Sequence, residues 1–195
     1  MMLRTLVLVV GVGVAAVGCD GGDDTPARCT NTAALATVFP ADGEVAGFTV
    51  AAGSTFETAS TKNDLVALID GAADPFTDNG FVTWGRQHYT DGSNTLDYQV
   101  YQMPSVAANE TTWAAELDPA KSYRQSQVAG GWTDVAGIGD AARVANGGAA
   151  VWWYGVRKCA YQVDAHITDL SGTKSDATKT AAETYLKAAV AKIPE

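Results

Sequence analysis

The sequence lacks an apolar run long enough to cross a bilayer. Its N-terminal apolar stretch runs only from Thr5 to Val17 and no later one is longer, whereas a spanning helix needs roughly 20 residues. Positive charge is scarce too, because 13 Lys and Arg residues stand against 22 Asp and Glu residues, for a formal net charge of −9. An acidic surface repels phosphate backbones and anionic headgroups. The composition therefore argues against nucleic-acid binding and against peripheral lipid binding by the domain itself.

Motifs that carry known hydrolytic chemistry are also missing. The chain contains no G-x-S-x-G and no H-E-x-x-H, patterns of common nucleophilic and zinc hydrolases. Its two histidines, His88 and His166, fall in different predicted strands without the close spacing of a zinc site. Asp164 lies on the same strand face as His166, which predicts one small polar patch. We therefore predict no catalytic residue, no metal and no cofactor.

Two weaker patterns have plainer interpretations. Residues 137–142 match G-x-G-x-x-A, but no buried strand precedes them and no helix follows, so they predict a tight turn rather than a nucleotide site. Asp70, Asp74 and Asp78 recur every four residues. Calcium would accept such oxygens, but the spacing of an EF-hand is absent, which favours a solvated helix face.

The N-terminus has the layout of an export signal. Arg4 precedes the apolar stretch and no carboxylate occurs before Asp20, an order typical of a signal peptide. Residues 16–19, Ala-Val-Gly-Cys, resemble the lipobox of bacterial lipoproteins, in which the cysteine receives diacylglycerol and becomes the mature N-terminus. Ala16 stands where that motif usually has Leu, and the alternative is cleavage by ordinary signal peptidase at the same small residues.

These features predict three segments: a signal peptide over residues 1–18, a lipidated flexible tether over 19–28, and a single domain over 29–195. Lipid on Cys19 would hold the domain on the cell envelope, facing the periplasm, without a transmembrane helix. Asp20 resembles the inner-membrane retention signal of enterobacterial lipoproteins, but the choice between inner and outer membrane stays open.

The remaining two cysteines, Cys29 and Cys159, become an even pair once Cys19 is assigned to lipid. An oxidising compartment would allow them to form a disulfide, and two separate thiols are the alternative. No C-x-x-C motif is present to lower the pKa of a thiol, so redox catalysis is not predicted.

Hydrophobic periodicity predicts hairpins in alternation with helices. Helical spacing covers 61–76, 105–117 and 174–192, the last an amphipathic helix. Strands are predicted at 48–52 with 55–58, 81–90 with 95–103, and 149–154 with 159–167, the last pair turning near Arg157 and Lys158. The stretch from Gly130 to Gly148 is glycine-rich and predicts turns. The result is an α+β class fold, an antiparallel sheet of hairpins with packed helices and a C-terminal amphipathic helix.

Aromatic residues gather in the best predicted strands. Consecutive Trp152, Trp153 and Tyr154 must point to alternating faces. If helices cover both faces, these rings are core; if one face is open, they form a platform for a hydrophobic or ring-bearing ligand. The residues predicted for such binding are Trp84, Tyr101, Trp152, Tyr154 and His166.

The helix and strand motifs resemble a known family. Residues 65–81 carry Ile-Asp-Gly-Ala-Ala followed by an aromatic and Gly-Phe, and residues 100–103 read Val-Tyr-Gln-Met. This is similar to a bacterial exported family of unknown function, from which Asp74-Pro75 departs. More loosely, the order of elements resembles the Mog1/PsbP-type α/β/α sandwich, a likeness of fold alone.

These observations together predict a non-enzymatic lipoprotein module that binds an envelope protein or a small ligand. The alternative is an envelope enzyme, hydrolase-like, whose site is assembled only by folding.

Overall fold

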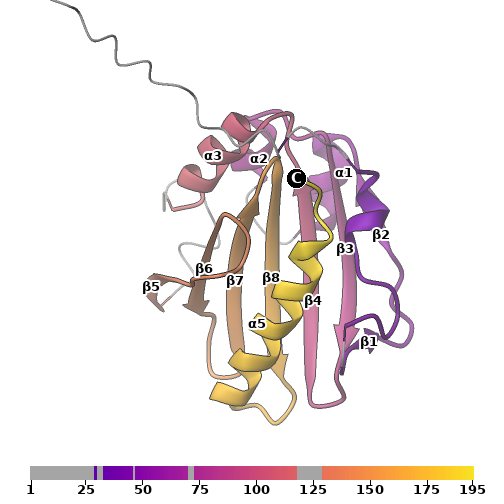
Figure 1. The fold of residues 1–195 in the computed structure, drawn as a ribbon, viewed down its shortest axis with the longest axis vertical. Coiled ribbons are helices and arrows are strands. Elements are labelled where there is room, and N and C mark those ends of the chain that lie inside the picture. The colour runs from indigo at the N-terminus through magenta and orange to yellow at the C-terminus, as the bar shows by residue number, and fades with distance from the viewer. Residues whose placement is uncertain (1–28, 30–32, 46, 70–72, 118–128) are drawn as a thin grey trace, which may run out of the picture.

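The computed structural model describes residues 29, 33–45, 47–69, 73–117 and 129–195. The predicted signal peptide, Cys19 and the predicted tether lie outside these residues. The described part forms one antiparallel eight-stranded sheet with helices on both faces, which confirms the α+β prediction (Figure 1). No described helix is both long and apolar enough to cross a membrane.

The sheet is built mainly from hairpins between neighbouring strands. Its order is β1-β3-β4-β8-β7-β6-β5, with β2 also paired to β3. The strands are β1 (Thr49–Val50), β2 (Glu57–Ala59), β3 (Thr83–Thr90), β4 (Asn94–Gln102), β5 (Ala129–Asp134), β6 (Ala141–Asn146), β7 (Val151–Lys158) and β8 (Tyr161–Asp169).

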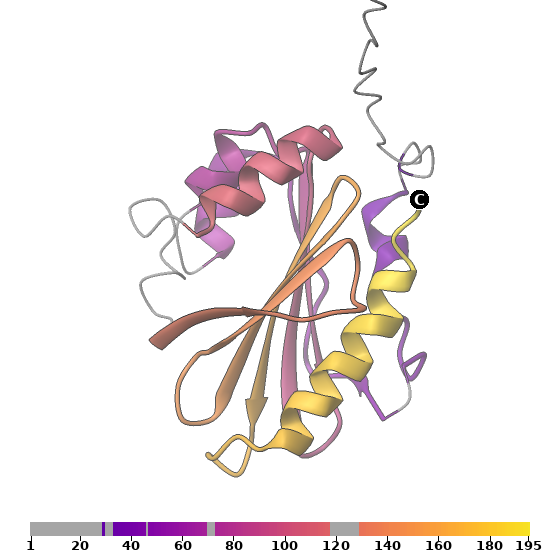
Figure 2. The same ribbon diagram turned by 60° about the vertical axis from the view of Figure 1, so that its left-hand side comes forward.

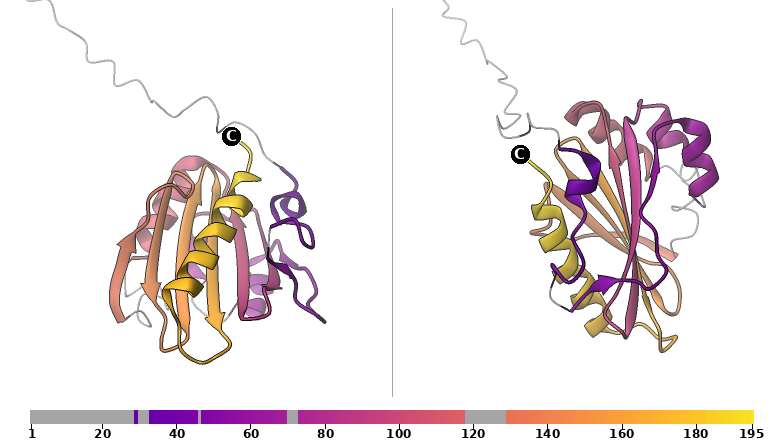
Figure 3. Two further views of the ribbon diagram at one scale, coloured as in Figure 1. Left: turned by 60° about the horizontal axis from the view of Figure 1, so that its bottom comes forward. Right: turned by 90° about the vertical axis from the view of Figure 1, so that its right-hand side faces the viewer.

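The helices divide between the two faces of the sheet. They are η1 (Leu35–Val38), α1 (Lys62–Leu68), α2 (Asp74–Thr77), α3 (Val106–Ala115) and α5 (Asp176–Ala191). The long helix α5 crosses one face diagonally, while α1, α2 and α3 gather at one end of the other face (Figures 2 and 3). We call the face covered by α5 the α5 face and the opposite face, which carries many polar side chains, the polar face.

Local signals position most of these elements as predicted. Ser105 caps α3, and Ser175 begins α5 with a reciprocal capping box to Thr178. In the β3–β4 turn, the Asp91 carboxylate accepts hydrogen bonds from the backbone N–H groups of Ser93 and Asn94. These short-range contacts explain why this hairpin and these helices are readable from the sequence.

The predicted helix over 61–76 is wrong in its middle. Thr61 caps α1, but α1 ends at Leu68 because Ile69 is already extended. A separate short helix, α2, then starts at Asp74 with Pro75 in its first turn. The backbone N–H groups in the first turn of a helix make no hydrogen bond within the helix, so the N–H that proline lacks is not needed there. Proline therefore begins a helix more readily than it continues one.

Three strand predictions need correction. The glycine-rich stretch predicted as turns contains two strands, β5 and β6, held by pairing to each other and to β7. The predicted strands before residue 60 each pair with β3 instead of with one another. The β7–β8 turn falls at Cys159 and Ala160 rather than at Arg157 and Lys158, and Cys159 adopts a positive φ of 50° there.

The main core lies between α5 and the sheet. Tyr185 on α5 is fully buried and packs its ring on Phe48, Tyr89 and Tyr98, with centroid distances of 4.9, 5.1 and 5.7 Å. Further buried residues of this core are Leu96, Val100, Tyr154, Val156, Val163, Ala165, Ile167, Leu186 and Val190. Leu96, Tyr98 and Val100 alternate along β4, and all three lie in this core.

Burial of tyrosines predicts a loss of stability at alkaline pH. Burial raises the pKa of Tyr89 to about 12, although a hydrogen bond with Tyr185 opposes it. Burial also raises the pKa of Tyr98, Tyr154 and Tyr185. The folded state therefore holds these protons more tightly than the unfolded chain, so their contribution is complete below the ordinary tyrosine pKa near 10 and is lost above it.

We expect the domain to lose stability as the pH rises from 10 to 12. Far-UV circular dichroism should change together with the tyrosinate absorbance that Tyr89, Tyr98, Tyr154 and Tyr185 contribute. Complete tyrosinate absorbance from all seven tyrosines with the circular dichroism unchanged would contradict the prediction.

Candidate functional site

The face of the sheet opposite α5 carries an unusual concentration of polar side chains. Strand alternation places every second residue on this face. These residues define the polar face: Trp84, Arg86 and His88 on β3; Asp97, Gln99 and Tyr101 on β4; Gln162, Asp164 and His166 on β8; Trp153, Gly155 and Arg157 on β7; Arg143 on β6; Trp132 and Asp134 on β5.

The strand register arranges the polar face in rows that cross the sheet. One row pairs Tyr101 with Gln162 and Gln162 with Arg157. The next runs Gln99, Asp164, Gly155, Arg143. The third runs His88, Asp97, His166, Trp153. Directly opposite side chains in such rows lie about 5 Å apart at Cβ, so residues distant in sequence become neighbours.

Several of these polar groups are buried. Gln162 and Asp164 have no exposed surface and Arg143 is 2 % exposed. Within the described residues, neither the side-chain oxygen nor the side-chain nitrogen of Gln162 has a hydrogen-bond partner. Burying an amide that stays unsatisfied costs about 1–3 kcal/mol by mutational measures.

Arg143 is held between aromatic rings. Its guanidinium carbon lies 3.8 Å from the centroid of Trp113 and 4.9 Å from that of Trp132. Gly155 on the neighbouring strand makes room for this stack, since a Cβ there would come within 3.2 Å of both Arg143 Nε and the Trp113 ring. A side chain at Gly155 would therefore displace the arginine or the indole.

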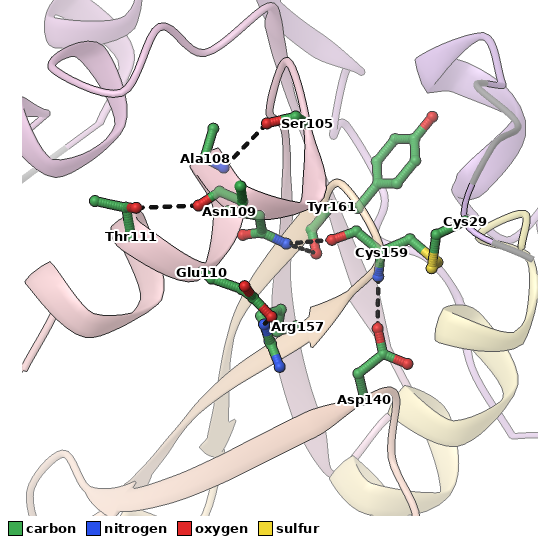
Figure 4. Close-up of polar contacts among 11 residues, drawn as sticks. Cys29, Ser105, Ala108, Asn109, Glu110, Thr111, Asp140, Arg157, Cys159 and Tyr161 are labelled. Atoms are coloured by element: carbon green, nitrogen blue, oxygen red, sulfur yellow. Dashed lines mark hydrogen bonds and ion pairs between the residues drawn. A yellow bond between two sulfur atoms is a disulfide. The ribbon is translucent and has the colours of Figure 1, made fainter. Parts of the chain in front are cut away.

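Helix α3 closes one end of the polar face and is tied to the β7–β8 turn (Figure 4). The fully buried Asn109 donates from its side-chain nitrogen to the carbonyls of Cys159 and Tyr161, at 2.8 and 2.9 Å. Glu110, one residue on, forms an ion pair with Arg157. These contacts position Trp113, on the same helix, over Arg143.

Replacing Asn109 with alanine should loosen this end of the site. The change leaves two buried carbonyls without their donor, which we expect to cost about 2–3 kcal/mol. Chemical denaturation measures the loss, and hydrogen exchange should show it as faster exchange along α3. The matched control is Thr111→Ala on the exposed side of the same helix, expected within about 0.5 kcal/mol of the parent. Equal effects of both changes would contradict the anchoring role.

A disulfide joins Cys29 to Cys159, with a Cα–Cα distance of 5.2 Å. This is the pairing predicted from the cysteine count. Asp140 lies against it, but its carboxylate accepts a hydrogen bond from the backbone N–H of Cys159 at 2.7 Å (Figure 4). Although the ligating atoms of these three residues lie within 4.8 Å of one another, the sulfurs are bonded to each other and are not thiolates available to a metal.

The five residues predicted for ligand binding do not form one surface. Trp84 and Tyr101 are buried on the polar-face side beneath α1 and α2, where Phe76 stacks on Tyr101 at 3.7 Å. Trp152 and Tyr154 belong to the α5 face, where the Tyr154 hydroxyl donates to the Lys179 carbonyl. His166 lies on the polar face. Because helices cover both faces, most of these aromatic residues are part of the core. Ligand binding at His166 stays a prediction.

The G-x-G-x-x-A segment forms a turn into β6, as predicted, with positive φ at Gly137 and Gly139. It lines a surface pocket of about 240 Å³ together with Lys158, Lys187 and Glu195. Lys158 Nζ lies 3.7 Å from a Glu195 carboxylate oxygen. This pocket therefore holds charges of both signs and shows no preference for an anion.

Sequence reasoning missed Asp97, Gln99, Gln162 and Arg143 as site residues. The signal that could have found them was the alternation in β4 and β8, where polar residues occupy every second position. Asp164 and His166 were predicted to share a face, and the register confirms that they do.

Comparison with protein-family models finds no match, and comparison with curated proteins finds none either. Among solved structures, the extracellular domain of PknH from Mycobacterium tuberculosis is similar with a TM-score of 0.40 and 10 % identity, covering 74 % of this chain and 81 % of that one. An uncharacterised protein from Mycobacterium smegmatis, the Rv0999 ortholog, has a TM-score of 0.38 and 14 % identity, covering 76 % and 90 %. Likeness at this level carries no property of those proteins to this chain.

Proposed function

We propose that this protein is a lipid-anchored module of the bacterial cell envelope that binds a small polar ligand on the polar face of its sheet. The observation that carries the proposal is Gln162, a fully buried amide with no hydrogen-bond partner among the described residues. Buried polar groups in native proteins are almost always hydrogen-bonded, so this amide calls for a bound group that supplies the missing donor and acceptor. Ligand binding would satisfy both amide atoms.

The neighbours of Gln162 indicate the chemistry of this ligand. Among the described residues, two more buried side-chain atoms lack a hydrogen-bond partner, the Oδ1 of Asn109 and the Nε of Arg157. Donors and acceptors are therefore mixed, and Arg157 is already neutralised by Glu110. Helix α3 carries Trp113 one turn from Asn109 and so adds apolar area at this end of the face. This combination fits a neutral ligand with both hydroxyl or amide groups and apolar faces, such as an amide-bearing saccharide.

The test pairs stability with binding at Gln162. Gln162→Leu removes the unsatisfied amide, so we expect the free energy of unfolding to rise by about 1–3 kcal/mol. N-acetylglucosamine and its short oligomers, titrated into the full chain, should shift the NMR signals of the Gln162 side-chain amide and of β8. The same titration of Gln162→Leu should leave β8 unshifted.

The matched control is Gln102→Leu, on the same sheet but only partly buried, which should bind as the parent does. Two results would oppose the proposal: no shift of the Gln162 amide at millimolar saccharide, or equal shifts in the parent and in Gln162→Leu.

The anchoring part of the proposal rests on residues 16–19 and on the disulfide, which is typical of oxidising compartments. Mass spectrometry of the mature N-terminus should find an acylated Cys19. A mature chain with a free α-amine and a free thiol at Cys19 would rule out the lipoprotein assignment while leaving the ligand site unaffected.

A further inference from the structure

The two histidines of the chain flank one aspartate across three neighbouring strands. Their separation in sequence gives no hint of this, yet the register pairs His88 with Asp97 and Asp97 with His166. The chain has only 2 histidines in 195 residues, and both occupy the same row of the polar face. All three residues are partly exposed, although Asp97 Oδ1 and His166 Nε2 themselves lie below the surface.

The backbone brings the first pair especially close. The His88 carbonyl accepts a hydrogen bond from the Ala51 N–H, and the His88 N–H points to Ser54 Oγ. Both backbone groups of His88 therefore point away from β4, and His88 and Asp97 form a non-hydrogen-bonded pair. Cα atoms in such pairs lie about 4.5 Å apart, closer than in the alternating hydrogen-bonded pairs.

We propose that His88, Asp97 and His166 form a binding site for a divalent transition metal ion of the Zn²⁺ type. Two imidazoles and a carboxylate are a donor set that Zn²⁺ accepts, with the fourth position left to water. The outer strands lie about 10 Å apart, two strand spacings, so both imidazoles have to turn toward Asp97 about their side-chain torsions to share one ion with its carboxylate.

The residues around this row suit such a site. The Gln99 side-chain nitrogen donates to the second carboxylate oxygen of Asp97 at 3.3 Å, which orients the carboxylate. The His166 ring stacks on Trp153, with centroids 5.2 Å apart and 25° between the planes. The ring contact itself is worth about 1 kcal/mol, which is small beside the free energy of transition-metal binding. Asp164, two residues before His166 on the same face, adds negative charge near the ion.

The test is calorimetric titration of ZnCl₂ into the full chain without an affinity tag. The Cys29–Cys159 disulfide is kept oxidised and the third cysteine, Cys19, is replaced with serine, so that no thiolate competes. We expect one Zn²⁺ per chain, and no comparable binding of Ca²⁺ or Mg²⁺, which prefer all-oxygen sites. Substituting Co²⁺ should produce visible d–d absorption bands of a tetrahedral site.

Single substitutions at the three ligands separate this site from adventitious binding. His88→Gln, His166→Gln and Asp97→Asn should each weaken Zn²⁺ binding at least tenfold, with folding verified by circular dichroism. Asp78→Asn, an exposed carboxylate on the α2 side, should leave binding unchanged. Absence of Zn²⁺ binding by the parent, or binding that survives in the His88→Gln/His166→Gln double variant, would overturn the proposal. Gln162→Leu should bind Zn²⁺ as the parent does, so failure here is distinguishable from failure of the saccharide proposal.

Discussion

Replacing Cys29 and Cys159 together with alanine should lower the free energy of unfolding by about 5 kcal/mol. The disulfide spans 130 residues of sequence, and closing a loop of that length restricts the unfolded chain by this amount on the chain-entropy model. For a domain of this size, the loss corresponds to a fall in Tm of about 10–20 °C. Differential scanning calorimetry of the parent and the double variant measures it.

The reducing agent supplies the control for this prediction. The parent in dithiothreitol should unfold at a temperature close to that of the double variant, and the double variant should be insensitive to dithiothreitol. A double variant whose Tm stays within about 2 °C of the oxidised parent would show that the bridge contributes little. Hydrogen bonds between Ala33 and the Tyr161 hydroxyl, at 3.0 and 3.2 Å, hold the nearby chain independently of the sulfurs.

Truncating Tyr185 to alanine should cost about 3–5 kcal/mol, the next largest effect we expect. The ring is fully buried and packs edge-on or tilted against Phe48, Tyr89 and Tyr98. Removing a large aromatic from such a site forfeits its burial and leaves a cavity that the surrounding rings fill only in part. Urea denaturation measures the change as a lower midpoint at an unchanged slope.

Two variants on or near the same helical turn test the origin of that loss. Tyr185→Phe keeps the ring and should cost no more than about 1.5 kcal/mol. Lys187→Ala, on the exposed side of α5, should lie within about 0.5 kcal/mol of the parent. A Tyr185→Phe variant as unstable as Tyr185→Ala would assign the effect to the hydroxyl group instead of to packing.

Local patterns predicted the parts of the fold that depend on near neighbours. The β3–β4 hairpin follows from alternation on both sides of a turn whose Asp91 bonds only two and three residues ahead. Helices α3 and α5 follow from serine caps and helical spacing. In each case the residues that specify the element lie within it or beside it, so a sequence window contains the whole signal.

Predictions failed where pairing with a distant strand outweighs local preference. Strands β5 and β6 contain or adjoin glycines that read as turns, and β6 is extended because β7 supplies its hydrogen bonds. Residues 49–50 and 57–59 are strands as predicted, but each pairs with β3 and not with the other. Strand propensity is largely a measure of such neighbours, which a single sequence does not reveal.

The sequence by itself determined the α+β class, the β3–β4 hairpin, the acidic composition and the export-like N-terminus. For Cys29 and Cys159 it left two options, a disulfide or two separate thiols. Only the tertiary structure decided which face each aromatic meets, and that His88, Asp97 and His166 share one row. The physical reason is that register between strands is set by burial of one whole face and by turn geometry. Side chains on the opposite face are brought together by that choice, although nothing in their own spacing along the chain indicates it.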